Sequence, residues 1–447
     1  MAKRRVFTAK DVNPFGQLVG TNGGDLLIGG PKVRQIQGKG GDDILRGSNR
    51  VDLLQGGAGN DTLFGGGGND RLQGGAGRDR LFGGDGTDEL LMRNPGTIAR
   101  GQDGNDRLLI YNANQIVIDG GRGNDFYLLA VDGPVNIVDV QGNDTVQADR
   151  ILQFTLPSGI ENLRVSRIDQ PGSYTGNDGN NNLNGFQDRT GFFQVVWRVE
   201  LFGEGGNDLL RGDIAPDLLD GGEGDDALFG SEGLDTLNGG AGRDYMAGGS
   251  EDDTYYVDDV GDDVVESSGT SAGNDIVFSV ISYTLSANVE RLTLSGAEDI
   301  DASGNVLDNT ITGNDGTNVI AGGGGNDLLT GGLGADIFAY ASVSESGPSA
   351  VGATDEITDL QGSAGDRIDI SAIDADPVAT GDQPFTWLGL LSSAATPFTV
   401  DPQSGQVGYV FNAGSRYVVL NLDTDAESEM AIEVRGSGAI DATWITL

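Results

Sequence analysis

A single aliphatic residue recurs every nine positions along much of the chain, within a background of glycine and polar residues. Residues 56–84 read GGAGNDTLFGGGGNDRLQGGAGRDRLFGG, in which Leu63, Leu72 and Leu81 stand in step. The residues around each aliphatic position alternate, as on a short strand with one side chain turned inward. The glycine-rich residues before it predict a turn, because glycine adopts backbone angles that a Cβ atom forbids.

Two nine-residue repeats, each G-G-x-G-x-D-x-U-x with U aliphatic, make one coil of strand, turn, strand and turn, so equivalent residues recur every 18 positions. Coils should stack about 4.8 Å apart, as neighbouring strands do. The frame holds from Gly20 to Leu109, and weaker copies continue past one inserted residue to Asp125 and Asp144. A second block begins at Gly203 and a third at Gly304. The pattern therefore predicts an all-β solenoid.

The eighth position of each repeat is predicted to fill the core, and the sixth position is acidic in most copies. The eighth-position residues are Leu27, Ile36, Leu45, Leu54, Leu63, Leu72, Leu81, Leu90, Ala99, Leu108, Leu210, Leu219, Leu228, Leu237, Met246, Tyr255, Ile311, Ile320, Leu329 and Phe338. The sixth-position aspartates are Asp25, Asp43, Asp52, Asp61, Asp70, Asp79, Asp88, Asp106, Asp208, Asp217, Asp226, Asp235, Asp244, Asp253, Asp262, Asp327 and Asp336. Arg34 and Thr97 interrupt the acidic series, and Asn181, Asn309 and Asn318 take its place in other copies.

Coils of 18 residues arrange these aspartates in columns. Asp25 is expected beside the turn that holds Asp43, and Asp52 beside the turn that holds Asp70. Carboxylates about 5 Å apart repel each other unless a cation lies between them. Carboxylate and turn carbonyl oxygens form a hard-oxygen site, and the flexible number of ligands favours Ca²⁺ over Mg²⁺.

The nine-residue phrase resembles that of the RTX family, the hemolysin-type calcium-binding repeat proteins. The resemblance implies a right-handed parallel β-roll with Ca²⁺ between successive turns, about ten ions in all. It also implies that the sixth-position aspartates and the carbonyl groups of the glycine turns are the ligands. Sites that touch Arg34 and Thr97 are expected to be missing, and those at the asparagine positions to be weaker.

Composition supports a cation-dependent fold and excludes several kinds of chemistry. The 447 residues include 76 glycines, and the formal net charge is −41. A chain so acidic and so poor in hydrophobic residues stays open without a counter-charge, and it repels nucleic acid and anionic membranes. With no Cys and no His, the chain has no disulfide, no thiolate site, no HExxH zinc motif and no His-based catalysis. No apolar run suits an ordinary secretory signal or a transmembrane span.

The blocks are separated by spacers that resemble each other. FTLPSGIENLRV at 154–165 matches YTLSANVERLTL at 283–294, so a longer unit is duplicated, and its coils are expected to continue the solenoid without calcium. The aromatic insertion at 191–202, with Phe192, Phe193 and Trp197, reads as an edge-covering strand or cap, or alternatively as a contact for a partner or glycan.

The region after residue 340 lacks the glycine repeat. Its segment DEITDLQGSAGDRIDISAID at 355–374 is similar to the C-terminal region of the serralysin-type secreted proteases, which implies an uncleaved type I secretion signal and a β-rich cap. DTDAESE at 423–429 loosely resembles the start of an EF-hand, but an exposed hairpin turn is the favoured interpretation. The predicted segments are 1–19, 20–147, 148–202, 203–266, 267–303, 304–339 and 340–447.

These features predict a secreted protein that folds on Ca²⁺ outside the cell, either free or associated with the cell surface. Its partners are expected to be calcium, the type I secretion machinery, and either other copies of itself or cell-surface glycans. A surface-layer, matrix or adhesion role is favoured, without catalysis. The alternative is a secreted effector or polysaccharide-acting enzyme whose activity lies in 148–202 or 340–447, since paired carboxylates of the kind glycosidases use occur throughout.

Overall fold

The computed structural model describes most of the chain, which forms two compact units, residues 1–230 and residues 231–447. The described residues are 4–111, 115–131, 135–139, 141–166, 168, 170–185, 197–269, 273–346, 354–374, 385–391, 405–412, 415–422, 429–435 and 439–447. Two expectations fall partly outside them: residues 191–196 of the aromatic insertion, with Phe192 and Phe193, and the DTDAESE segment except for its last residue. The rest of the insertion, 197–202, is described, and Val199–Phe202 forms a strand that is paired on both sides. In the described part of the chain no helix has the length and apolar character needed to cross a membrane.

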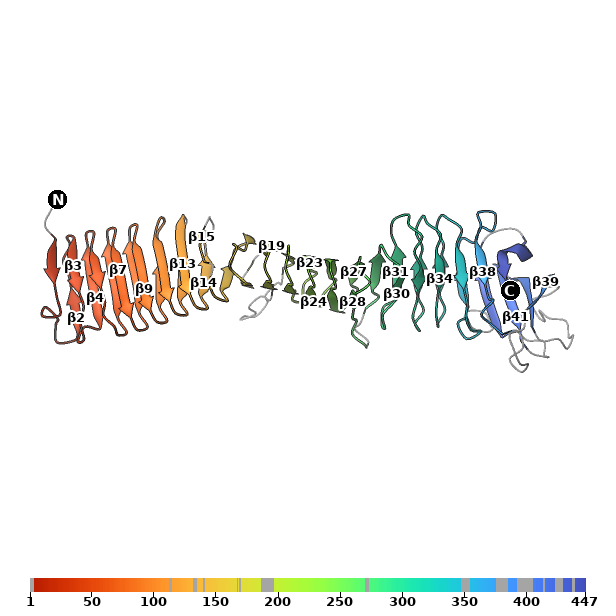
Figure 1. The fold of residues 1–447 in the computed structure, drawn as a ribbon, viewed down its shortest axis with the longest axis horizontal. Helices are drawn as coiled ribbons and strands as arrows, with labels where there is room; N and C mark the ends of the chain where they lie inside the picture. Colours follow the sequence, from red (N-terminus) through yellow and green to blue (C-terminus); the bar gives the residue numbers. More distant parts are fainter. Residues whose placement is uncertain are drawn as a thin grey trace. The chain divides into compact units, whose positions relative to one another are not determined.

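In the first unit, strands that follow one another along the chain alternate between sheets, and each strand pairs in parallel with the strand one coil away (Figure 1). One sheet contains β1 (Arg5–Phe7), β3 (Asp25–Ile28), β5 (Ile44–Arg46), β7 (Thr62–Gly67), β9 (Arg80–Asp85), β11 (Ile98–Asp103), β13 (Ile116–Arg122) and β15 (Val135–Ile137). The second contains β2 (Gln17–Val19), β4 (Gln35–Gly40), β6 (Leu53–Ala58), β8 (Arg71–Ala76), β10 (Glu89–Met92), β12 (Arg107–Tyr111), β14 (Phe126–Ala130), β16 (Thr145–Asp149), β18 (Asn162–Ser166), β20 (Asn182–Asn184), β22 (Leu209–Arg211) and β24 (Ala227–Glu232). The third contains β17 (Gln153–Thr155), β19 (Gly172–Thr175), β21 (Val199–Phe202) and β23 (Leu218–Glu223).

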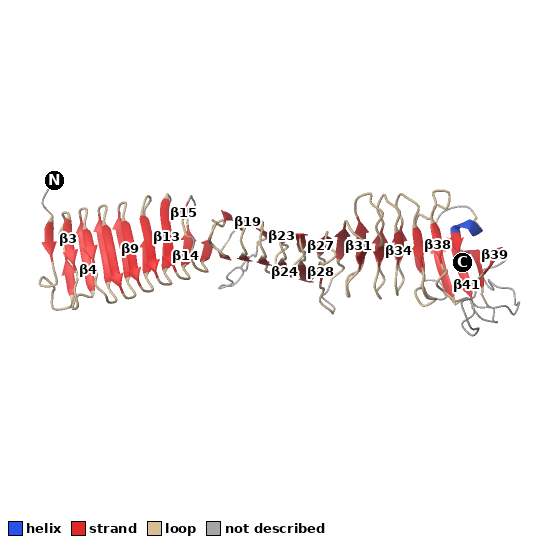
Figure 2. Ribbon diagram, in the orientation of Figure 1, coloured by secondary structure: helices blue, strands red, loops and turns tan. Residues whose placement is uncertain are grey.

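The second unit has the same alternation. One sheet runs through β25 (Thr236–Ala241), β27 (Thr254–Val257), β29 (Ile276–Ser279), β31 (Arg291–Leu294), β33 (Thr310–Thr312), β35 (Leu328–Thr330) and β37 (Asp355–Ile357). The facing strands are β26 (Tyr245–Ser250) and β28 (Asp263–Val264), and then β30 (Tyr283–Thr284), β32 (Ala302–Ser303), β34 (Val319–Ala321), β36 (Ile337–Ala339), β38 (Arg367–Asp369) and β43 (Ile445–Thr446). Figure 2 shows how completely strands and short loops account for both units.

The register of the strands follows the nine-residue pattern. Leu63 pairs with Leu45 on one side and with Leu81 on the other, which is a spacing of 18 residues in each direction. Every eighth-position side chain from Leu27 to Phe338 is fully buried, so each sheet directs a row of mostly aliphatic side chains into the interior of its unit. The predicted all-β parallel solenoid is confirmed.

The spacers continue the solenoid. Val146 pairs with Leu163 in the first spacer, and Val277 pairs with Leu292 in the second, each in a parallel register and each fully buried. The duplicated segments therefore supply coils whose core is apolar.

The C-terminal region covers the end of the second unit. After β37 the sheet receives β42 (Met430–Val434) in parallel, and β41 (Ser415–Asn421) and β40 (Gln406–Asn412) then join it in antiparallel pairing. β39 (Thr386–Leu390) forms the outer edge. The one 3-10 helix in the described residues, η1 (Ala442–Trp444), precedes β43 (Figure 1). A β-rich cap follows the repeats, as the C-terminal pattern predicted.

Candidate metal centres

The sixth-position aspartates connect successive coils. The backbone N–H of Asp43 donates to Oδ1 of Asp61 at 2.8 Å, and the N–H of Asp61 donates to Oδ1 of Asp79 at 2.9 Å. Further bonds of the same kind join 25 to 43, 52 to 70, 70 to 88, 88 to 106, 208 to 226, 235 to 253 and 244 to 262. One oxygen of each accepting carboxylate is thus held at a fixed place between two coils.

The second carboxylate oxygen is left without a hydrogen-bond donor in many of these turns. It is buried and unpartnered in Asp43, Asp61, Asp70, Asp88, Asp106, Asp208, Asp253, Asp327 and Asp336. A buried carboxylate oxygen without a donor or a positive charge beside it is strongly unfavourable. The same defect repeated from coil to coil indicates that a cation belongs there.

Glycine makes room for each of these carboxylates. A Cβ atom on Gly74, at the first position of its repeat, would lie 2.2 Å from Oδ2 of Asp79. At the second and fourth positions, Gly75 and Gly77 have φ angles of +103° and +127°. Their Cβ atoms would lie 2.0 Å from the carbonyl oxygens of Gly57 and Gly59, one coil earlier. The turns therefore bring carbonyl oxygens as well as carboxylates close to the next coil.

Burial makes the charged form of these aspartates unfavourable. It raises the pKa of Asp61, Asp70 and Asp106 to about 7, although a backbone hydrogen bond from the preceding coil opposes the shift. Neighbouring carboxylates add to it: Asp79 and Asp43 raise the pKa of Asp61 further. For these three aspartates the backbone hydrogen bond is the one contribution from the described residues that favours the charged form, and the donor set of carboxylate and carbonyl oxygens fits a hard divalent cation such as Ca²⁺.

The structure places sixteen of the seventeen predicted ligands in the interior, each no more than 3% exposed. Asp262 is the exception, since it is half-buried at the end of its column and also accepts from the N–H groups of Asp258 and Asp259. Neither interruption supplies a carboxylate to its turn. Arg34 is exposed, and Thr97 donates its hydroxyl to the carbonyl of Asn94 in its own turn.

At the asparagine positions the side-chain amide donates hydrogen bonds that a carboxylate could not donate. The Nδ2 group of Asn318 donates to the carbonyl oxygen of Ile300 at 2.6 Å and to Oδ1 of Asn314 at 2.9 Å. Asn309 likewise donates to the carbonyl oxygens of Val289 and Glu290. An amide at the sixth position therefore satisfies the carbonyl groups that would otherwise face an ion.

Several carboxylates that were not among the predicted ligands continue the columns. The backbone N–H of Asp106 donates to Oδ1 of Asp125, and the N–H of Asp125 donates to Oδ1 of Asp144. In the second unit the N–H of Asp253 donates to Oδ1 of Asp275. Asp355 and Asp366 accept in the same way from Asp327 and Asp336, 28 and 30 residues earlier. The sequence signal was a G-N-D triplet for 125, 144 and 275, whereas the long insertions before 355 and 366 hid the register.

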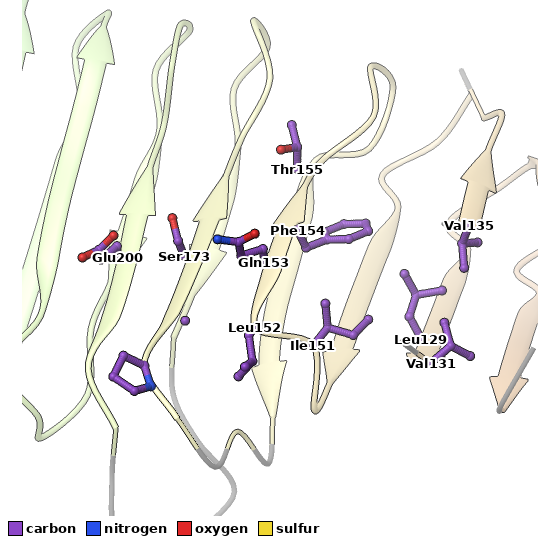
Figure 3. Close-up of a pocket in the computed structure, with 12 residues that line it drawn as sticks. Leu129, Val131, Val135, Ile151, Leu152, Gln153, Phe154, Thr155, Ser173 and Glu200 are labelled. Carbon is purple, nitrogen blue, oxygen red and sulfur yellow. The ribbon is translucent and has the colours of Figure 1, made fainter. Parts of the chain in front are cut away.

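A cavity of about 800 Å³ lies in the first unit, within the region considered for a hidden activity. Figure 3 shows Leu129, Ile151, Leu152 and Phe154 among the side chains that line it. Among the described residues that line the cavity, Glu200 is the one carboxylate.

Comparison with known proteins identifies the repeats. A family model described as the RTX calcium-binding nonapeptide repeat (4 copies) matches residues 37–72, 65–91, 202–237, 220–255, 229–265 and 303–338. No curated protein matches the chain. The matched segments contain the predicted ligands except Asp25 and Asp106, together with the left-handed Gly75 and Gly77. The chain therefore carries the calcium-binding nonapeptide repeats of the RTX family in three separate regions.

Proposed function

We propose that this chain is a secreted calcium-binding protein whose folded solenoid has a structural role, in a surface layer, a matrix or adhesion, rather than a catalytic one. The observation that supports the proposal is the column of buried aspartates in which a carboxylate oxygen lacks a donor from coil to coil. Proteins with RTX repeats are typically secreted. Calcium is the partner that the repeats indicate.

The residues explain why folding would wait for the outside of the cell. With 68 acidic and 27 basic side chains, the chain repels itself, and its glycines lose much conformational freedom on folding. Where free Ca²⁺ is scarce, the aspartates of adjacent coils repel each other and the chain stays open for export. Bound Ca²⁺, at the roughly 10⁻⁴–10⁻³ M that extracellular modules require, supplies the positive charge between the carboxylates, and its binding free energy becomes folding free energy.

Export by a type I route is part of the proposal. It is supported by the segment at 355–374, which is similar to the secretion region of the serralysin-type proteases. In the structure this segment includes β37 and β38, which pair with the last repeat strands. The secretion signal would therefore become part of the folded solenoid once the chain is outside.

The test compares the full chain in a calcium chelator and in millimolar Ca²⁺. At a pH of about 8, circular dichroism should report strand structure only with Ca²⁺, and sedimentation or binding to producer cells should show calcium-dependent association. An unchanged spectrum would contradict calcium-driven folding. Turnover of a polysaccharide panel, lost when one carboxylate is replaced, would instead support the enzymatic alternative.

A further inference from the structure

Two groups of buried acidic residues differ from the repeat turns in having a third carboxylate and a tyrosine. The Tyr127 cluster consists of Asp125, Asp139 and Asp144 with Tyr127, and it lies in the first unit. The Tyr255 cluster consists of Asp253, Glu266 and Asp275 with Tyr255, and it lies in the second. In each, one oxygen atom from every carboxylate lies within 4.8 Å of the other two.

In the Tyr127 cluster the tyrosine replaces the aliphatic residue at the eighth position and is fully buried. Its hydroxyl accepts from the N–H of Gly120 at 2.7 Å and donates to Oδ2 of Asp139. Oδ1 of Asp144 accepts from the N–H of Asp125 at 2.7 Å, and the N–H of Asp144 donates to Glu161 at 2.7 Å. Glu161 thereby ends the column of aspartates.

The Tyr255 cluster repeats this arrangement. The hydroxyl of Tyr255 accepts from the N–H of Gly248 at 2.6 Å and donates to Oε1 of Glu266. Oδ1 of Asp275 accepts from Asp253 at 2.8 Å, and the N–H of Asp275 donates to Glu290 at 2.9 Å. Glu161 and Glu290 are equivalent residues of the two duplicated segments, so the same device occurs twice.

The third carboxylate occupies a place that is glycine in the calcium repeats. Ile118 pairs with Ile137, so Asp139 is in register with Gly120, the first residue of the preceding repeat. Met246 pairs with Val264, so Glu266 is in register with Gly248 in the same way. At the end of the column a side-chain carboxylate therefore takes the place where a further repeat would begin. β15 and β28, the strands just before these two residues, are labelled in Figure 1.

The clusters contain more acceptors than donors. Oδ2 of Asp125, Asp144, Asp253 and Asp275 is buried and has no hydrogen-bond partner, and these four side chains are at most 2% exposed. The tyrosine hydroxyl has a single proton, which it gives to Asp139 or Glu266. Asp139 also accepts from the N–H of Gln141, and Glu266 accepts from the N–H of Ser267. The four Oδ2 atoms nevertheless stay without a donor in groups of mutually repelling carboxylates, and this arrangement favours a cation between them.

We propose that each cluster binds one Ca²⁺ through three side-chain carboxylates, at a site of different construction from the repeat turns, and that Tyr127 and Tyr255 are positioning residues for the third ligand. The inference rests on the proposed calcium-dependent function. A site with three carboxylates should bind Ca²⁺ more tightly than a turn with two, because affinity rises with the number of charged ligands. These two ions would close the calcium columns where the apolar spacer coils begin.

The experiment is a calorimetric Ca²⁺ titration of the full metal-free chain and of the double variant Asp139→Asn with Glu266→Gln. Both replacements keep an oxygen that can accept from the tyrosine hydroxyl and remove only the charge. We expect two fewer tightly bound ions per chain. The matched control, Asp103→Asn with Glu232→Gln, removes two charges from exposed repeat positions and should bind the original number.

The result that overturns the inference is a double variant that binds as many ions, as tightly, as the unaltered chain. If the unaltered chain binds no Ca²⁺ at all, the proposed function fails as well, so the two failures are distinguishable. Should the double variant not fold, Tyr127→Phe with Tyr255→Phe decides the question, since it keeps every carboxylate. Two ions should then bind about 10–100-fold more weakly, and unchanged affinities would refute the positioning role.

Discussion

The raised pKa values predict that protons can partly substitute for calcium. Burial raises the pKa of Asp70 and Asp106 in the folded solenoid to about 7, from an ordinary value of 3.8. Because the folded state holds these protons more tightly than the unfolded state, the metal-free solenoid is most stable below about pH 4 and loses stability as the pH rises to about 7. Lowering the pH from about 8 to about 5 should stabilise it by about 2–3 kcal/mol for each such carboxylate.

The assay is circular dichroism of the chelated chain at several pH values in that window, with denaturant unfolding at each pH where the strand signal is present. Strand signal should return as the pH falls, before the protein reaches its isoelectric point of about 4.1. The calcium-loaded chain should respond in the opposite direction, because ligands must be deprotonated to bind the ion. Asp70→Asn should weaken the pH dependence of the chelated chain, and the exposed Asp103→Asn should not. A metal-free chain whose stability is constant across this window would refute the reasoning.

Three further substitutions test the solenoid itself. Gly75→Ala forces a side chain into a left-handed conformation and against the carbonyl oxygen of Gly57. Denaturant unfolding in Ca²⁺ should therefore show that the unfolding free energy falls by at least about 1–2 kcal/mol. The control Gly67→Ala should cost little, because its Cβ would meet nothing closer than 3.6 Å. Leu72→Ala should lower the unfolding free energy by about 2–5 kcal/mol because it empties a fully buried site, and Leu234→Ala, at a residue 52% exposed, should be nearly neutral in the same assay. Asn318→Asp removes two amide hydrogen bonds and adds a buried charge, so the metal-free variant should regain its strand signal at a lower pH than the unaltered chain. An unchanged midpoint pH would show that the amide is dispensable.

Much of the repeat structure was predictable from local sequence. The nine-residue period determines which side chains enter the core, because a residue two positions beyond the acidic one always faces inward on a strand, as Leu63 and Leu72 do. The same period places Asp43 beside Asp61, since equivalent residues of stacked coils are 18 apart. These relations hold within one coil and its neighbour, and they need no knowledge of the rest of the chain.

The turn conformations already depend on the neighbouring coil. Lys39 and Ser48 both stand at the second position of a repeat, yet Lys39 has a φ of +78° and Ser48 does not. Ser48 instead donates its N–H and hydroxyl to Asp52, at 2.7 and 2.9 Å. Asn314 and Asn318 form a similar local cap. A cap of this kind gives the sixth-position carboxylate or amide a hydrogen-bond donor from its own turn. Such a local donor is needed where the preceding coil has no complete glycine turn.

The ends of the columns were decided only by tertiary structure. By itself the sequence determined the period, the core and the ligand type, since these depend on residue chemistry repeated at constant spacing. It did not determine that Asp139 and Glu266 complete the two acidic clusters, because their register is set by the pairing of Ile137 and Val264 across variable connections. Asp355 meets Asp327 for the same reason, after a 28-residue excursion. Strand pairing across such insertions depends on contacts far apart in the chain, and local spacing does not record them.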